Sequence, residues 1–142
     1  IVFPESLTKI QTQAFLDCDG ITALSFPDSL EMIGQNAFQD CDNIEMVKFP
    51  ENLEIKDSAF WNCIGIKELN MPKGVTFGRQ VFNGCTGLES FTFPEDAEVI
   101  TEGILYGCSN LKSVTLPTEV KDIQDAAFHS CSSLTSRILL QI

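Results

Sequence analysis

An internal period of 22 or 23 residues constrains this chain more than any other feature. Prolines and cysteines both recur at that spacing, at Pro4, Pro27, Pro50, Pro72, Pro94 and Pro117 and at Cys18, Cys41, Cys63, Cys85, Cys108 and Cys131. A fixed period of this length is typical of solenoids, in which each repeat buries its apolar side chains only against its neighbours. The sequence therefore predicts stacked coils whose equivalent residues lie in single files.

Each coil contains a short segment in which apolar and polar residues alternate, as in Leu24-Ser25-Phe26 and Val47-Lys48-Phe49. Alternation with a period of two predicts a strand. Because these segments recur at the same phase, we expect the strands to pair in parallel and in register, about 4.8 Å apart. The proline that follows the strand has no amide hydrogen to donate, so it is expected to end the ladder.

The rest of each coil is predicted from the other columns. A second short extended piece is expected at 30–33 and its equivalents, followed by a single helical turn at Ala-Phe-x-x-Cys. Gly and Asn adopt positive φ most readily, so we predict a left-handed turn two residues after each cysteine. The residues at that column are Gly20, Asn43, Gly65, Gly87, Asn110 and Ser133.

Two of the coils are one residue shorter than the others. Leu53 and Ile55 are two positions apart, as are Val75 and Phe77, where the corresponding residues of a longer coil are three apart. We expect the deletion to lie in a connecting bend and to leave the core columns intact.

The segments Ala14-Phe15-x-x-Cys18, Ala37-Phe38-x-x-Cys41, Ala59-Phe60-x-x-Cys63 and Ala127-Phe128-x-x-Cys131, each followed by Leu or Ile, resemble the BspA-like, or treponemal-type, leucine-rich repeats. The resemblance covers nearly the whole chain. It implies a right-handed leucine-rich-repeat solenoid, β-rich α/β, with a parallel sheet on the concave face and short strands and single helical turns on the convex side. Val81, Ile104 and Leu105 are conservative departures. Arg137 replaces Leu, Val or Phe, which puts the final strand in doubt.

The domain organisation predicted is a single leucine-rich-repeat domain, 1–142, of about six coils. The first four residues match the strand that ends a coil, so we expect the chain to be a piece of a longer array. The run Ile138–Ile142 breaks the alternation and is expected to be a cap, a truncated coil or appended sequence. An unpaired apolar edge strand can template association, so self-association through this end is a further hypothesis.

Composition and motifs exclude several classes of function. The net charge of −11 disfavours nucleic-acid binding, and no apolar run approaches the roughly 20 residues needed for membrane insertion. The cysteines follow the repeat, so they are expected to form a ladder of free, buried thiols. Four carboxylates, Asp17, Asp19, Asp40 and Asp42, suggest Ca²⁺ only weakly because later coils lack them. No catalytic motif or cofactor site is recognised, and His129 lacks the partners of a triad.

The favoured hypothesis is a protein-binding module that presents its parallel sheet to a macromolecular partner. The outward residues predicted on that sheet are Ala23, Ser25, Met46, Lys48, Glu68, Asn70, Ser90, Thr92, Ser113 and Thr115. Trp61 is either an exposed anchor or a ring packed across the adjacent coil. The family resemblance implies a cell-surface or secreted protein that adheres to a host or matrix protein. The alternative is a passive structural spacer within a larger surface protein.

Overall fold

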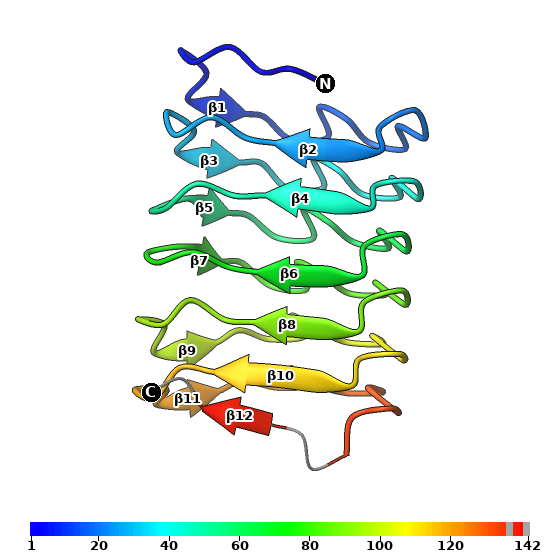
Figure 1. The fold of residues 1–142 in the computed structure, drawn as a ribbon, viewed down its shortest axis with the longest axis vertical. Coiled ribbons are helices and arrows are strands. Elements are labelled where there is room, and N and C mark those ends of the chain that lie inside the picture. Colours follow the sequence, from blue (N-terminus) through cyan, green and yellow to red (C-terminus); the bar gives the residue numbers. More distant parts are fainter. Residues whose placement is uncertain (136–137, 141–142) are drawn as a thin grey trace.

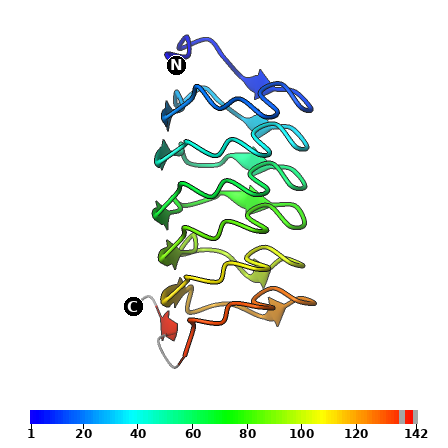
Figure 2. The ribbon, with the colours of Figure 1, turned by 90° about the vertical axis from the view of Figure 1, so that its right-hand side faces the viewer.

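The computed structural model describes residues 1–135 and 138–140, and these residues form a solenoid (Figure 1). Strands on the front run from right to left while the chain descends, and strands on the back return from left to right. This winding is right-handed, as the resemblance implied. The stack is close to straight over this length (Figure 2), and no helix occurs in the described residues.

Two files of short parallel strands form the front and back of the solenoid. The front strands are β2 (Ala23–Ser25), β4 (Met46–Lys48), β6 (Glu68–Asn70), β8 (Ser90–Thr92), β10 (Ser113–Leu116) and β12 (Ile138–Leu140). The back strands are β1 (Lys9–Ile10), β3 (Met32–Ile33), β5 (Glu54–Ile55), β7 (Thr76–Phe77), β9 (Val99–Ile100) and β11 (Asp122–Ile123). Equivalent residues pair, as Leu24 does with Val47 and Ile33 with Ile55. The predicted parallel, in-register strands are confirmed.

The segment Ala-Phe-x-x-Cys forms consecutive turns, so the prediction of a helical turn was wrong. Alternate amides of this segment donate to the next coil: the Phe38 amide lies 2.8 Å from the Ala59 oxygen, and the Asp40 amide 2.9 Å from the Trp61 oxygen. An amide that donates along the stack cannot also make the bond within its own chain segment that a helix needs. Every coil interface between Gln13 and His129 carries such bonds.

Most residues with positive φ lie directly before the cysteine or directly before the alanine column, not two residues after the cysteine as predicted; Asn52 and Gly74 are the exceptions. Asp17, Asp40, Asn62, Gly84, Gly107 and Ser130 form the first of these columns, all with positive φ. The residues two positions after the cysteine instead face a carbonyl of the preceding coil. A Cβ added to Gly87 would lie 2.1 Å from the Ile64 oxygen, whereas the Asn110 amide group donates to the Thr86 oxygen at 2.7 Å. Close approach, rather than φ, explains this column.

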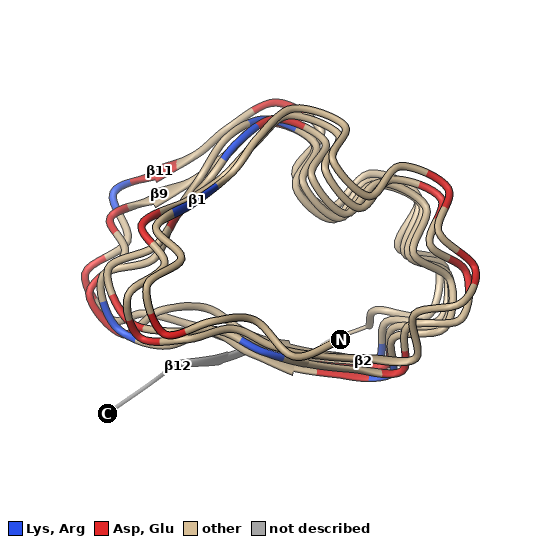
Figure 3. Cartoon of the chain, turned by 90° about the horizontal axis from the view of Figure 1, so that it is seen from above, with Lys and Arg blue, Asp and Glu red and all other residues tan. Residues whose placement is uncertain are grey.

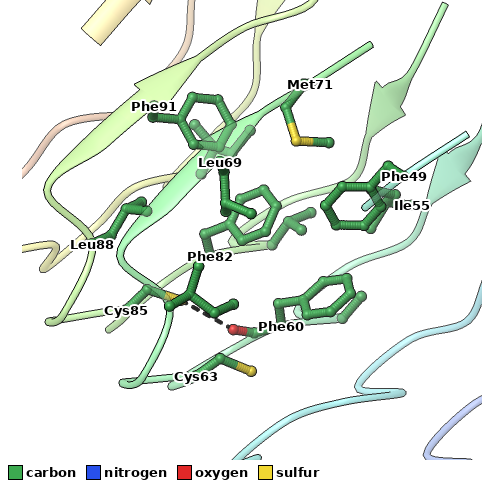
Figure 4. Packing of buried hydrophobic residues seen from close by; sticks show 14 of the residues in the cluster. Phe49, Ile55, Phe60, Cys63, Leu69, Met71, Phe82, Cys85, Leu88 and Phe91 are labelled. Carbon is green, nitrogen blue, oxygen red and sulfur yellow. Dashed lines mark hydrogen bonds between the residues drawn. The ribbon is translucent and has the colours of Figure 1, made fainter. Parts of the chain in front are cut away.

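The core is a set of aromatic and aliphatic files that run along the stack, and Figure 4 shows a part of it between Phe49 and Phe91. The rings of Phe38, Phe60 and Phe82 are stacked, with centroids 5.2 and 5.7 Å apart. Phe49, from the second phenylalanine column, meets Phe60 edge-on at 5.5 Å. Phe38, Phe60 and Phe82 are fully buried, because the neighbouring coils cover the ring of each coil from above and below. Seen from above, the coils superimpose, and stretches of Asp and Glu recur around their outline (Figure 3).

The final strand, which Arg137 had placed in doubt, does form. β12 pairs in parallel with β10, and Ile138 lies opposite Val114. A spacing of 23 residues would have placed Arg137 at that position, so the register is shifted by one residue. Arg137 itself lies outside the described residues.

Candidate functional site

The outward residues of the front strands form one surface, which we call the front sheet face. It consists of Ala23, Ser25, Met46, Lys48, Glu68, Asn70, Ser90, Thr92, Ser113 and Thr115. Between them, Leu24, Leu69 and Phe91 point into the core. The residues of β2, β4 and β6 on this face are exposed, whereas those of β8 and β10 are half-buried. The face is therefore most accessible in its N-terminal half.

Among the described strands, the front sheet is interrupted between β4 and β6. β2 pairs with β4, and β6 pairs with β8, but β4 and β6 belong to separate sheets and are spaced more widely than the other front neighbours (Figure 1). Elsewhere, the residue before the strand donates to the preceding coil, as the Glu89 amide does to the Lys67 oxygen at 2.8 Å. In the described residues, no such bond joins Lys67 to Glu45, and the Phe49 amide does not donate to β6.

A cleft of about 660 Å³ lies at this interruption, which we call the front gap. It is lined by Glu45, Met46, Val47, Lys48, Phe49, Lys67, Glu68 and Asn70. The structure thus brings together four residues of the front sheet face, two from β4 and two from β6. Met46 is 70% exposed, which is high for a large apolar side chain. Val47 is half-buried, whereas its counterparts Leu24 and Leu69 are buried.

The charged side chains beside the front gap are not paired with each other in the described structure. The column before the front strands alternates in sign from Glu45 through Lys67 and Glu89 to Lys112. In a closed part of the sheet, the Lys112 amine lies 3.7 Å from the Glu89 carboxylate. Across the front gap, the corresponding pair of Glu45 and Lys67 is not within ion-pair distance in the described structure. Both charges consequently remain available to a binding partner.

The back sheet has its own interruption, between β7 and β9, with a cavity of about 320 Å³. Ala97 lines this cavity at a column occupied by leucine or valine in other coils, and the smaller side chain leaves space. Side chains bridge this interruption. The Thr101 hydroxyl donates to the Gly78 oxygen at 2.8 Å, and the Gly74 amide donates to the Asp96 carboxylate at 3.0 Å.

Both interruptions fall where the coil length changes. The two shorter coils lie between Pro50 and Pro94, and the residue they lack falls directly before β5 and β7. β5 stays in register with β3, because Glu54 pairs with Met32. The shorter coils are therefore joined to the preceding coils along the back sheet and to the following coils along the front sheet. The junction with the preceding coils is open in the front sheet, and the junction with the following coils is open in the back sheet.

The cysteines lie in one file and supply a repeated hydrogen bond. The Cys63 thiol donates to the Phe38 oxygen at 3.0 Å, and the Cys85 thiol donates to the Phe60 oxygen at 3.2 Å. Burial raises the pKa of Cys41 from 9.0 to about 11 and raises the pKa of Cys63, Cys85, Cys108 and Cys131 as well. All six are free thiols. The cysteines therefore have a structural role, because the neutral thiol donates a hydrogen bond to a carbonyl of the preceding coil. The sequence predicted that the thiols are buried but not that they make this bond.

The other residues singled out from the sequence lie away from the front gap. Trp61 is half-buried on the turn side, in the same column as Tyr106 and His129, whose rings stack at 4.8 Å. Asp40 accepts a hydrogen bond from Asn62 at 3.0 Å. No group of three or more His, Cys, Asp or Glu is arranged for a metal ion in the part of the chain that the structure describes. That part also contains no helix able to cross a membrane.

Comparison with known families decides the relationship. A model of the BspA type leucine-rich repeat region, six copies, matches residues 1–78 and 54–141. The chain belongs to this family. The BspA-type pattern accounts for the coil, the front strands and the files of phenylalanine and cysteine described above.

Solved structures of bacterial leucine-rich repeat proteins share this BspA-type fold. The T. pallidum leucine-rich repeat protein matches with a TM-score of 0.88 and 31% identity, over 96% of this chain and 64% of that one. A leucine-rich repeat protein from Bacteroides ovatus matches with a TM-score of 0.67 and 27% identity, over 96% and 41%. The pneumococcal vaccine antigen PcpA matches with a TM-score of 0.77 and 24% identity, over 98% of this chain and 40% of that one. This chain thus spans less than two thirds of each relative. No curated protein sequence matches.

Sequence reasoning located the front sheet face of this BspA-type chain but missed the front gap. The available signal was the loss of one residue before Ile55 and Phe77, which was interpreted as a bend without consequence. A ladder of such short strands can be interrupted at a change of coil length, because each pair of strands contributes only a few hydrogen bonds.

Proposed function

We propose that this BspA-type chain is a protein-binding module whose partner contacts the front sheet face, centred on the front gap. The observation that supports this proposal most directly is the convergence of Met46, Lys48, Glu68 and Asn70 around one accessible cleft. Exposed methionine adapts its shape to varied apolar partners. Lysine, glutamate and asparagine beside it supply polar contacts of both signs.

The partner proposed is another protein, such as a host or extracellular-matrix protein, and the chain is proposed to act at the cell surface or after secretion. PcpA, which shares the fold, is described as a vaccine antigen. Adhesion fits a solenoid, because a face built of repeated strands offers contacts over many coils. The net charge of −11 favours a partner with basic patches over one rich in phosphate.

A second candidate function is a passive spacer within a larger surface protein. It is favoured by the small side chains of the C-terminal half of the face, where Ser90, Thr92, Ser113 and Thr115 offer few of the residue types that dominate binding energy. Binding at Trp61, on the turn side, would also leave the front sheet face without a role.

The test is capture of purified extracellular-matrix and cell-surface proteins by the immobilised chain. A variant with alanine at Met46, Lys48, Glu68 and Asn70 should lose at least about tenfold in affinity for a captured partner, since central contacts dominate interfaces. A matched variant with alanine at Ser90, Thr92, Ser113 and Thr115 should lose much less. Equal binding by both variants, with loss on Trp61→Ala, would move the site to the turn side. Absence of any partner would favour the spacer.

A further inference from the structure

The facing edges of β4 and β6 carry backbone groups that the rest of the fold leaves without a protein partner. The amide of Lys67, which would donate to Glu45 in a continuous sheet, makes no hydrogen bond in the described structure, and the same holds for the amide of Phe49 toward β6. The groups face a cleft open to solvent, so water satisfies them in the free protein. They are a ready template for another chain.

The front gap differs in this respect from the interruption in the back sheet. On the back, the Thr101 hydroxyl and the Asp96 carboxylate form side-chain hydrogen bonds across the interruption. On the front, no side chain among the described residues bridges Glu45 or Phe49 to the next coil. The Asn70 amide group, which lies close by, donates to the Glu68 carboxylate of its own strand at 3.0 Å. Of the two interruptions in the described residues, the front gap is the one whose strand edges no side chain bridges.

The coils at the front gap are fixed against each other on their other two sides. At the same coil interface, β3 pairs with β5 on the back, and the Asp40 amide donates to the Trp61 oxygen at 2.9 Å on the turn side. The Phe38 and Phe60 rings stack between these two sides. Because two sides of the interface are fixed, the opening on the third side persists without a ligand.

We propose that the front gap binds an extended segment of a partner polypeptide, which pairs its backbone with the free edges of β4 and β6. This inference rests on the proposed function of the front sheet face and specifies how the partner is recognised. An extended chain alternates donors and acceptors along its length, as the strand edges do, and such strand addition derives its affinity from main-chain hydrogen bonds. Alternate side chains provide the selectivity.

The residues that line the front gap predict which side chains the bound segment should carry. An inward side chain would rest against Val47 and Phe49, so an apolar residue is favoured there. The next side chains would lie on the outer surface beside Met46 and Glu68. A charged residue of either sign would find its opposite at Glu45 or Lys67, which are not paired with each other. The segment is thus expected to alternate apolar and polar residues.

The probe is a peptide with the sequence of residues 88–94, Leu-Glu-Ser-Phe-Thr-Phe-Pro, which pairs with β6 within the fold itself. Its matched control is the same peptide N-methylated at alternate amides, which keeps the side chains and removes backbone donors. Amide exchange is followed by NMR on the intact chain. Saturating peptide should slow exchange of the Phe49 and Lys67 amides by at least about tenfold, the protection expected of a new strand hydrogen bond. The Glu89 amide, already bonded, should not change.

Two results would overturn the proposal: equal binding of the N-methylated peptide, or no protection at Phe49 and Lys67 at saturation or at the solubility limit of the peptide. The same measurement with a captured protein partner separates this inference from the proposed function. Protection spread over Ser25 and Thr92 without change at Phe49 and Lys67 would retain the front sheet face as the site and reject strand addition. Protection confined to the turn side would reject both.

Discussion

A single coil interface, the one between the coils that end in β4 and β6, is closed on two sides and open on the third. On the turn side, the Phe38 and Asp40 amides donate to the next coil, and the Phe38 and Phe60 rings stack across the interface. On the front, the strands do not pair. The comparison indicates that the phenylalanine and cysteine files hold the solenoid together, and that strand pairing can be given up locally. The face that we propose to bind partners is therefore free to vary.

Ionisation of the buried cysteines should destabilise the closed side of the coil interfaces more than any other change. Below pH 9 the thiols are neutral in both states, and their contribution to stability is complete. Above pH 9 the unfolded chain loses thiol protons while Cys63, Cys85 and Cys108 keep theirs, because burial raises their pKa. These three should lower the free energy of unfolding by about 4 kcal/mol per pH unit, enough to unfold a typical domain within a few units.

Urea denaturation in reductant between pH 8 and 10.5 measures this effect. Lysine and tyrosine also titrate in this range, so the matched comparison is Cys85→Ala, whose pH slope should be smaller by about 1.4 kcal/mol per pH unit. A stability that stays level from pH 9 to 10.5 would contradict the buried, neutral file.

Truncating the phenylalanine file should be the next most severe change. Phe60 is fully buried between Phe38 and Phe82, so Phe60→Ala should cost about 3–5 kcal/mol through lost burial and the cavity left behind. Phe77, which is half-buried beside the back interruption, is the matched control. Phe77→Ala should cost about 1.5 kcal/mol. Equal losses in urea denaturation would mean that the open and closed regions contribute alike.

The sequence predicted the repeated parts of the fold well and the exceptions poorly. A period of 22 or 23 residues and the alternation around Leu24 and Val47 were sufficient for parallel strands, because every coil repeats the same signal. The turns at Ala-Phe-x-x-Cys were mistaken for a helix because their amides bond to another coil, which is a non-local choice. The candidate site was predicted only in part: the outward position of Met46 follows from alternation, but the gap beside it lies where two strands fail to pair, which no local pattern in the sequence signals.

The glycine column offers a test of close packing between coils. Gly87→Ala would place a Cβ 2.1 Å from the backbone oxygen of Ile64 and should cost about 1–3 kcal/mol, because the backbone must shift. Gly20 occupies the same column and has no atom within 4 Å of the corresponding position. Gly20→Ala should therefore change stability by about 0.5 kcal/mol or less. If φ rather than contact governed the column, both substitutions would be costly.

Restoring the residue that each short coil lacks should have the smallest effect on stability. It tests most directly whether coil length opens the front side of the interface. One residue inserted after Leu53 and one after Val75 would give both short coils the length of their neighbours. If coil length causes the interruption, β4 and β6 should then pair, and the Lys67 amide should gain the Glu45 oxygen as its acceptor. Global stability should change by about 1 kcal/mol or less, because the new hydrogen bonds replace bonds to water. Exchange of the Phe49 and Lys67 amides should slow by about tenfold, and the peptide 88–94 should no longer bind. Unchanged exchange at these amides would show that the front gap has another cause, such as the side chains that line it.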